Sequence, residues 1–191
     1  RGADRVLVFS KEQGDFLVAE YGVEARKIRI VPNGVADEFF LDTTRVVHKQ
    51  LRLLYVGRLS VQKRVERLIG AVQQAASDCH LMIVGDGEER ARLEVLAAGS
   101  KRITFMGTRT GAALIRLYER SDALVLSSDK EGMSLTMLEG MAAGLPIIAA
   151  DVPGIREHLS GVGVLVKDPS ADSFAAAIDA LYADRVHLVP V

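Results

Sequence analysis

The sequence is poor in cysteine and tryptophan. Its 191 residues include one cysteine, Cys79, and no tryptophan. A single cysteine cannot form an internal disulfide, and no histidine or cysteine cluster with metal-ligand spacing accompanies it. We therefore expect a reducing compartment and no bound metal.

Net charge and long apolar runs are also lacking. Lys and Arg together number 24 and Asp and Glu 25, so no overall field attracts nucleic acid or an anionic membrane. The most apolar stretch, GLPIIAA at 144–150, is interrupted by Pro146 and is too short to cross a bilayer. The opening residues form neither a signal peptide nor a transit peptide. These absences predict a cytoplasmic protein with no nucleic-acid partner and no transmembrane segment.

Strand patterns separated by helical patterns are abundant. Short runs rich in apolar and β-branched residues lie at 5–9, 28–31, 51–57, 80–85, 102–107, 122–127, 145–150 and 163–166. Several of them do not alternate with polar residues, which is typical of parallel strands covered on both faces. The rhythm predicts successive βαβ units.

The segments between these runs carry apolar side chains at helical spacing. The clearest examples are Val65, Leu68, Ile69 and Val72, followed by Leu114, Leu117 and Tyr118. Such stripes are typical of amphipathic helices packed on a sheet. We therefore predict an α/β fold, a Rossmann-like, doubly wound parallel sheet with helices on both faces.

Residues 31–50 are polar, rich in turn formers and without a clear period. We interpret them as a linker between domains. Residues 1–30 would then be the last βα unit of an otherwise missing amino-terminal domain, and 51–191 a complete domain. Because the chain opens almost directly on a strand without an initiator methionine, we expect a fragment.

Two cations follow the strand pattern at 51–57. Arg58 comes directly after Gly57, and Lys63 lies five residues later, near the start of the next helix. Helix amino termini hold unsatisfied N–H groups, Arg offers a bidentate fork and Lys a point charge, so this turn suits a phosphate. The alternative is a solvated basic turn.

The segment EGMSLTMLE at 131–139 contains a second candidate site. Ser134 is a credible N-cap of a helix that ends near Gly144. The periodicity predicts a buried stripe of Leu135, Leu138 and Ala142, and it places Glu139 about 40° from Leu135. Glu139 should therefore face inward or nearly so.

The two glutamates of this segment have alternative interpretations. An inward carboxylate needs hydrogen-bond donors, which either neighbouring backbone amides or sugar hydroxyls can supply. Glu131, before the helix, is either an exposed loop acid or a ligand-binding group. Between them lies the helix amino terminus with Gly132, Met133 and Ser134. This order suits a ligand with hydroxyls at both ends and a diphosphate between them, which describes a nucleotide sugar.

Other signatures are weak or absent. GDGEER at 85–90 lacks the third small residue of a dinucleotide fingerprint, because Arg90 stands in its place. No P-loop pattern occurs. The four histidines are scattered without metal spacing or a neighbouring nucleophile signature.

Five motifs in order resemble the carboxyl-terminal, donor-binding domain of the family 4 retaining glycosyltransferases of the GT-B fold. They are VGRL with Lys63, GDG at 85–87, FMG at 105–107, EGMSLTMLE at 131–139 and the following GMAAGLPIIAADVPGIRE. PNGV at 32–35 resembles that family's interdomain segment. One departure is VPGIRE at 152–157, which lacks the family's commoner double glycine and leaves Gly154 and Glu157 loosely placed near the donor.

The resemblance implies a role for each matching residue. Arg58 and Lys63 would neutralise the diphosphate, Glu131 would contact the donor sugar near the reacting carbon, and Glu139 would hold the ribose. These roles would make Arg58, Lys63 and Glu131 catalytic. The donor would also meet Gly107 near the base and Gly132, Met133 and Ser134 at the phosphate.

The resemblance also implies the reaction and its partners. A sugar would pass with retention from a nucleoside diphosphate, UDP or GDP, to an unidentified acceptor hydroxyl, with no cofactor and no metal. The absent D-x-D motif agrees with metal independence. The missing amino-terminal domain would supply the acceptor site and any peripheral membrane contact, so this fragment alone would be inactive.

Two other interpretations remain open. The chain is alternatively a non-catalytic nucleotide-sugar-binding module or half-protein that pairs with a separate acceptor domain. A third interpretation is an unrelated doubly wound domain, in which Glu139 is buried against protein.

Overall fold

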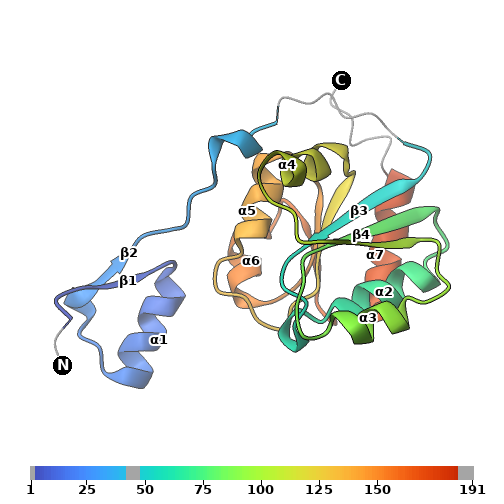
Figure 1. The fold of residues 1–191 in the computed structure, drawn as a ribbon. Helices are drawn as coiled ribbons and strands as arrows, with labels where there is room; N and C mark the ends of the chain where they lie inside the picture. Colours follow the sequence, from blue (N-terminus) through green and yellow to red (C-terminus); the bar gives the residue numbers. More distant parts are fainter. Residues whose placement is uncertain (1–2, 42–47, 185–191) are drawn as a thin grey trace.

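The computed structural model describes residues 3–41 and 48–184. Its strands form two parallel sheets, one of two strands and one of six. In Figure 1 the two-stranded unit and its helix lie to one side, and an extended segment leads from them to the larger sheet. The predicted α/β class with a Rossmann-like, doubly wound parallel sheet is confirmed.

Each strand lies where the sequence predicts one. The two-stranded sheet contains β1 (Val6–Val8) and β2 (Ile28–Ile30), and the larger sheet contains β3 (Leu51–Val56), β4 (Cys79–Val84), β5 (Ile103–Gly107), β6 (Ala123–Leu126), β7 (Ile147–Ala150) and β8 (Val164–Val166). Each observed strand pair is parallel. Apolar runs bounded by turns therefore located the strands.

Helices cover both faces of the larger sheet. They are α2 (Val65–Gln74), α3 (Arg90–Leu96), α4 (Gly111–Arg120), α5 (Leu135–Ala142), α6 (Pro153–Leu159) and α7 (Ala171–Asp184); α1 (Lys11–Tyr21) packs on the small sheet. Short 3₁₀ turns are η1 (Ala25–Lys27), η2 (Asp37–Phe39) and η3 (Val61–Lys63). Figure 1 shows α2, α3 and α7 on one side and α4, α5 and α6 on the other.

The strand order of the larger sheet is β5-β4-β3-β6-β7-β8. From β3 the chain winds outward through β4 to β5, then crosses back to β6 and winds outward in the opposite direction. The order therefore reverses between β3 and β6, which pair directly through Leu53 with Ala123 and Leu54 with Leu124. In open α/β sheets, ligands bind beside the carboxyl ends of the strands at such a reversal.

The strands whose sequences do not alternate with polar residues form the centre of the hydrophobic core. The residues of β6 and β7 are buried throughout, because both faces of these strands are covered. The predicted stripe of α2 is also buried: Val65, Leu68, Ile69 and Val72 each expose 1% or less. On α4, Tyr118 is fully buried, while Leu114 and Leu117 are partly buried against the core.

The predicted buried stripe of α5 is wrong at Leu135, and it misses the most deeply buried residues of the helix. Leu135 is 51% exposed, whereas Met137 is fully buried and Gly140 is buried too. A Cβ at Gly140 would lie 2.5 Å from Leu124 Cδ2 of β6. Because only glycine allows this approach, the helix turns its glycine face toward the sheet. Leu138 and Ala142 remain partly buried against the core.

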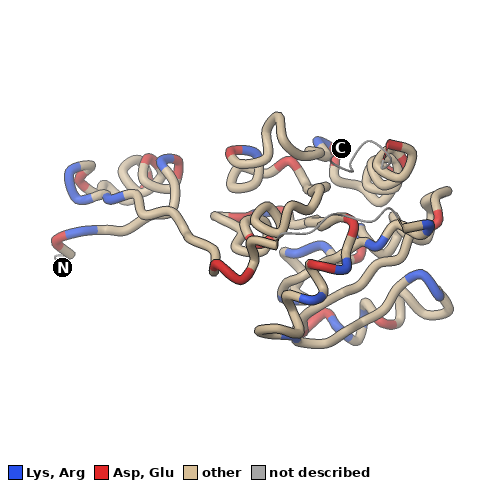
Figure 2. Tube along the Cα trace, turned by 90° about the horizontal axis from the view of Figure 1, so that it is seen from above, with Lys and Arg blue, Asp and Glu red and all other residues tan. Residues whose placement is uncertain are grey.

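Charged residues are distributed over the whole described trace. Figure 2 shows basic and acidic residues interspersed in both the two-stranded unit and the larger sheet region. In residues 3–41 and 48–184, no helix has the length and apolar character needed to cross a membrane. The division into 1–30, 31–50 and 51–191 stays a prediction, and its positions 1–2, 42–47 and 185–191 lie outside the described residues.

Candidate functional site

The candidate site lies where the loops after β3 and β6 meet. The β3 loop carries Arg58 and Lys63, and the β6 loop carries Glu131. Parallel strands end at the same edge of a sheet, and β3 and β6 are direct neighbours. Residues 68 positions apart are thereby brought into contact.

Lys63 and Glu131 form an ion pair at the centre of this site. Lys63 Nζ lies 2.5 Å from Glu131 Oε1, and Ser128 Oγ donates a 2.6 Å hydrogen bond to the same oxygen. The Glu131 side chain is only 10% exposed, against 26% for Lys63. Glu131 is therefore not an exposed loop acid. Charge-assisted hydrogen bonds of this kind offset the cost of burying the carboxylate.

Arg58 differs from Lys63 because its side chain has no polar partner in the described residues. It is exposed, and its guanidinium makes no hydrogen bond or ion pair within the described part of the chain. Its carbonyl accepts a 3.0 Å hydrogen bond from the buried Tyr55 hydroxyl, which fixes the turn. Burial raises the pKa of the Tyr55 phenol, and the Glu131 charge adds to this rise. The phenol therefore remains a neutral donor.

The amino terminus of α5 follows Glu131 directly. Ser134 is its N-cap, as predicted, and Ser134 Oγ accepts from the Met137 N–H at 3.2 Å. Met133 Sδ accepts from the Asn33 N–H at 3.2 Å. The remaining amides of the first turn supply the positive end of the helix dipole beside the Lys63–Glu131 pair.

Glu139, within the same helix, has a different environment. It is partly buried, and its Oε2 accepts a 2.6 Å hydrogen bond from the hydroxyl of Tyr118 on α4. Burial raises the pKa of the Glu139 carboxyl, and the Tyr118 hydrogen bond opposes that rise. Burial and the Glu139 contact raise the pKa of the Tyr118 phenol. The structure does not bring Glu139 into contact with Lys63 or Glu131.

Glycines let the loops at this edge approach one another closely. A Cβ at Gly85 would lie 1.9 Å from the Gly57 carbonyl oxygen, and one at Gly87 would lie 2.3 Å from the Leu59 carbonyl oxygen. The GDG motif therefore packs the β4 loop onto the β3 loop. Gly107 ends β5 with φ 65°, and its carbonyl accepts from the Gly85 N–H at 3.0 Å. Gly107 thus borders the same edge, two strands from β3.

A cavity of about 470 Å³ lies beside Glu131, between the β6 loop and the two-stranded unit. Its lining includes Glu131 and Gly132 on one side and Phe16 and Leu17 of α1 on the other. A Cβ at Gly132 would lie 2.8 Å from Gln13 Nε2, and one at Gly154 would lie 1.7 Å from the Gly132 carbonyl oxygen. Gly154 therefore lies against the site loop.

Several residues of the site escaped sequence reasoning. Ser128 had a local signal, since it precedes Glu131 by three residues and can reach back in a turn. No local sequence signal marked Tyr118 or Tyr55, because their contacts depend on how α4 packs on α5 and how the turn after β3 closes. Among residues 3–41 and 48–184, no group of three or more His, Cys, Asp or Glu gathers at a metal-binding distance.

Comparison with known proteins identifies relatives of the chain. Residues 50–184 match the family described as glycosyl transferases group 1. The sulfoquinovosyl transferase SQD2 of Arabidopsis thaliana is 33% identical over 167 residues, covering 82% of this chain and 32% of its own length. A GDP-mannose-dependent alpha-mannosyltransferase of Mycolicibacterium smegmatis is 37% identical over 134 residues, 69% of this chain and 34% of its own.

A solved structure has the same fold. Sucrose-phosphate synthase from Thermosynechococcus elongatus superposes with a TM-score of 0.85 at 28% identity, covering 98% of this chain and 51% of that one. The chain spans 32% to 51% of the length of the curated relatives first matched. Because the family match covers residues 50–184 of 191, the chain belongs to the group 1 glycosyl transferases, and the relationship predicted from its motifs is confirmed.

Proposed function

We propose that this chain is the donor-binding part of a retaining glycosyltransferase, which transfers a sugar from a nucleoside-diphosphate sugar to an acceptor hydroxyl. The observation that carries the proposal is the Lys63–Glu131 pair beside the amino terminus of α5, at the reversal between β3 and β6. One relative carries the name GDP-mannose-dependent alpha-mannosyltransferase, which supports a donor of this class.

The diphosphate is assigned to the cations and the helix start. Arg58, an exposed residue, is assigned a bidentate contact, and Lys63 exchanges part of its contact with Glu131 for a phosphate oxygen. The amides of Met133 and Ser134, with the flexible Gly132, add hydrogen bonds at the positive end of the helix. These preorganised donors stabilise the charge that develops on the leaving diphosphate.

The two carboxylates are assigned to the two sugars of the donor. Glu131 is assigned to the transferred sugar near the diphosphate, and Glu139 is assigned to the ribose hydroxyls, exchanging or sharing its hydrogen bond with Tyr118. Gly107 is assigned to the base, read through backbone contacts. The cations replace a bound metal in this assignment, so transfer should need neither metal nor cofactor. The acceptor site is assigned to an amino-terminal domain outside this chain.

Calorimetric titration with UDP, GDP, ADP and their sugar conjugates tests the proposal. One nucleotide should bind saturably in the presence of EDTA, and the Arg58→Ala, Lys63→Ala double variant should lose that binding. A matched control is Lys101→Ala, Arg116→Ala, which removes the same charge from two exposed residues away from the site. Equal loss in both double variants, or no binding by the folded wild-type chain, would contradict the assignment of this site.

A further inference from the structure

Arg64 joins η3 to α2 in an unusual backbone conformation. Its φ is 51° and its ψ is 39°, and it is the one non-glycine residue with positive φ in the described ranges. L-amino acids with a Cβ are disfavoured there, and they persist only where surrounding contacts hold them. The residue next to it is Lys63, whose side chain reaches Glu131. The cause of this strained turn therefore bears on the candidate site.

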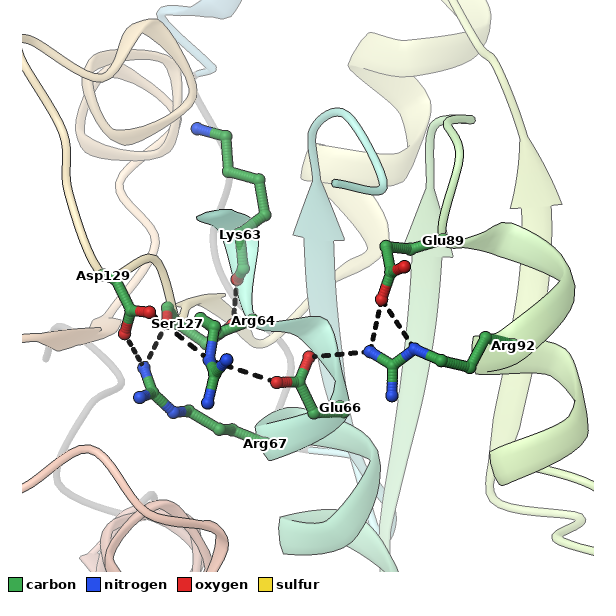
Figure 3. A network of polar contacts seen from close by, with 8 residues as sticks. All are labelled: Lys63, Arg64, Glu66, Arg67, Glu89, Arg92, Ser127 and Asp129. Carbon is green, nitrogen blue, oxygen red and sulfur yellow. Dashed lines mark hydrogen bonds and ion pairs between the residues drawn. The ribbon is translucent and has the colours of Figure 1, made fainter. Parts of the chain in front are cut away.

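Acidic side chains from two elements hold the Arg64 guanidinium. Its Nε lies 3.1 Å from Glu66 Oε1 and 3.4 Å from Asp129 Oδ2. The nitrogen is buried, and neither approach has hydrogen-bond geometry, so the attraction is that of an ion pair alone. Figure 3 shows Arg64 between these two carboxylates, with Glu66 linked onward to Arg92 of α3.

Asp129 closes a ring of contacts that returns to Lys63. Arg67 Nη1 donates to Asp129 Oδ1 at 2.6 Å and to the Ser127 carbonyl at 3.1 Å. Ser127 Oγ, fully buried, donates to the Lys63 carbonyl at 2.8 Å. The ring thus runs from Lys63 through Ser127, Arg67 and Asp129 to Arg64, which follows Lys63 in the chain (Figure 3).

The same two loops are also tied by main-chain contacts. The Asp129 N–H donates to the Gln62 carbonyl at 3.0 Å, and Gln62 Nε2 donates to the Lys130 carbonyl at 2.7 Å. These bonds hold the residues just before Glu131 against the residues just before Arg64. The two ends of the Lys63–Glu131 pair are therefore mounted on one connected unit.

We propose that Asp129, Arg64 and Arg67 are positioning residues that aim the Lys63 ammonium at Glu131. In Figure 3 the Lys63 carbonyl points into the ring while its side chain points away from it. The left-handed turn at Arg64 determines these two directions. Asp129 holds the turn in place through its ion pairs with Arg64 and Arg67. The consequence for the diphosphate rests on the proposed function; the effect on the ion pair does not.

A double-mutant cycle tests the proposal without any ligand. The coupling between Lys63→Ala and Glu131→Ala is measured on the free energy of unfolding in denaturant, first in the wild-type background and then in Asp129→Ala. The coupling should fall to less than half in the second background. Glu94→Ala is the control background, because Glu94 is 45% exposed and paired with Arg90, while Asp129 is 48% exposed. Unchanged coupling in Asp129→Ala would overturn the proposal.

Two further variants keep the test decisive if Asp129→Ala folds poorly. Asp129→Asn retains the shape of the side chain without its charge. Arg64→Gly should preserve the Lys63–Glu131 coupling, because glycine adopts the left-handed turn without help, whereas Arg64→Ala should lose it. Equal loss in the two Arg64 variants would contradict the role of the turn.

A nucleotide titration then separates this proposal from the assignment of the donor site. With UDP and GDP as probes, Asp129→Ala should lower the affinity of the bound nucleotide about threefold or more, and Glu94→Ala less than about twofold. If the wild-type chain binds neither probe, the donor-site assignment fails while the unfolding cycle still decides the positioning role. Full nucleotide affinity in Asp129→Ala would exclude any role in donor binding.

Discussion

The two glutamates of EGMSLTMLE differ in their surroundings although they are close in sequence: Glu131 lies in the loop before α5, and Glu139 lies within the helix. Glu131 meets a cation, Lys63, and the hydroxyl of Ser128. Glu139 meets the hydroxyl of Tyr118 and no cation in the described residues, and burial raises the pKa of its carboxyl. The first carboxylate has a cationic partner, whereas burial disfavours the charged form of the second. Position relative to the sheet edge decides which environment each receives.

The largest expected effect is on the stability of the protein when Glu131 loses its cationic partner. Lys63→Ala leaves the Glu131 carboxylate, only 10% exposed, without its cation. We expect the free energy of unfolding to fall by about 2 kcal/mol, less than for a fully buried pair because water reaches Lys63. Denaturant unfolding measures this loss. Lys11→Ala, from a pair exposed by 79% and 66%, should change stability by less than about 0.5 kcal/mol; similar losses in both variants would contradict the comparison.

A smaller effect is expected at the helix start between the two carboxylates. Ser134→Ala removes the bond to the Met137 N–H and should lower the free energy of unfolding by about 1 kcal/mol. Ser134→Asp should restore this stability, because aspartate is an equally good cap. The added negative charge should nevertheless weaken UDP or GDP binding. Undiminished nucleotide affinity in Ser134→Asp would place the phosphates elsewhere.

The smallest effect is expected at Glu139. Because its folded-state pKa is raised above the ordinary 4.5, the protonated form favours folding, and this contribution is lost as the pH rises through the folded pKa. Glutamine does not titrate and can still accept from Tyr118. Glu139→Gln should therefore be no less stable than wild type near neutral pH, with its relative advantage increasing as the pH rises above 4.5.

Denaturant unfolding across that pH range measures the difference between Glu139→Gln and wild type. The same variant should bind nucleotide more weakly if Glu139 accepts from the ribose. A variant that loses stability and keeps its affinity would instead make Glu139 a structural residue that does not contact the donor.

The strands and most helix faces were predictable because local patterns determine them. Apolar runs such as those of β6 and β7 mark buried strands, and the Val65 to Val72 stripe marks the inner face of α2. The buried face of α5 was not predictable, because it is centred on Gly140, and a glycine has no side chain that would mark a buried position in the sequence pattern. Its close approach to β6 depends on tertiary packing.

The site was predictable in its residue types but not in its contacts. The motifs identified Lys63 and Glu131 as candidates, yet their ion pair depends on β6 pairing with β3, and no local pattern specifies that order. The ring through Arg67 and Asp129 has the same origin. Nothing in the sequence singled out Arg64, since its left-handed turn depends on contacts that are distant along the chain.

The glycines of the GDG motif determine how closely the β3 and β4 loops approach each other. At Gly85 and Gly87 the β4 loop touches the carbonyls of the β3 loop directly, with no side chain between them. The contact is therefore made by main-chain atoms alone. Any larger residue at either glycine would push the β3 loop, and with it Arg58, away from the β4 loop.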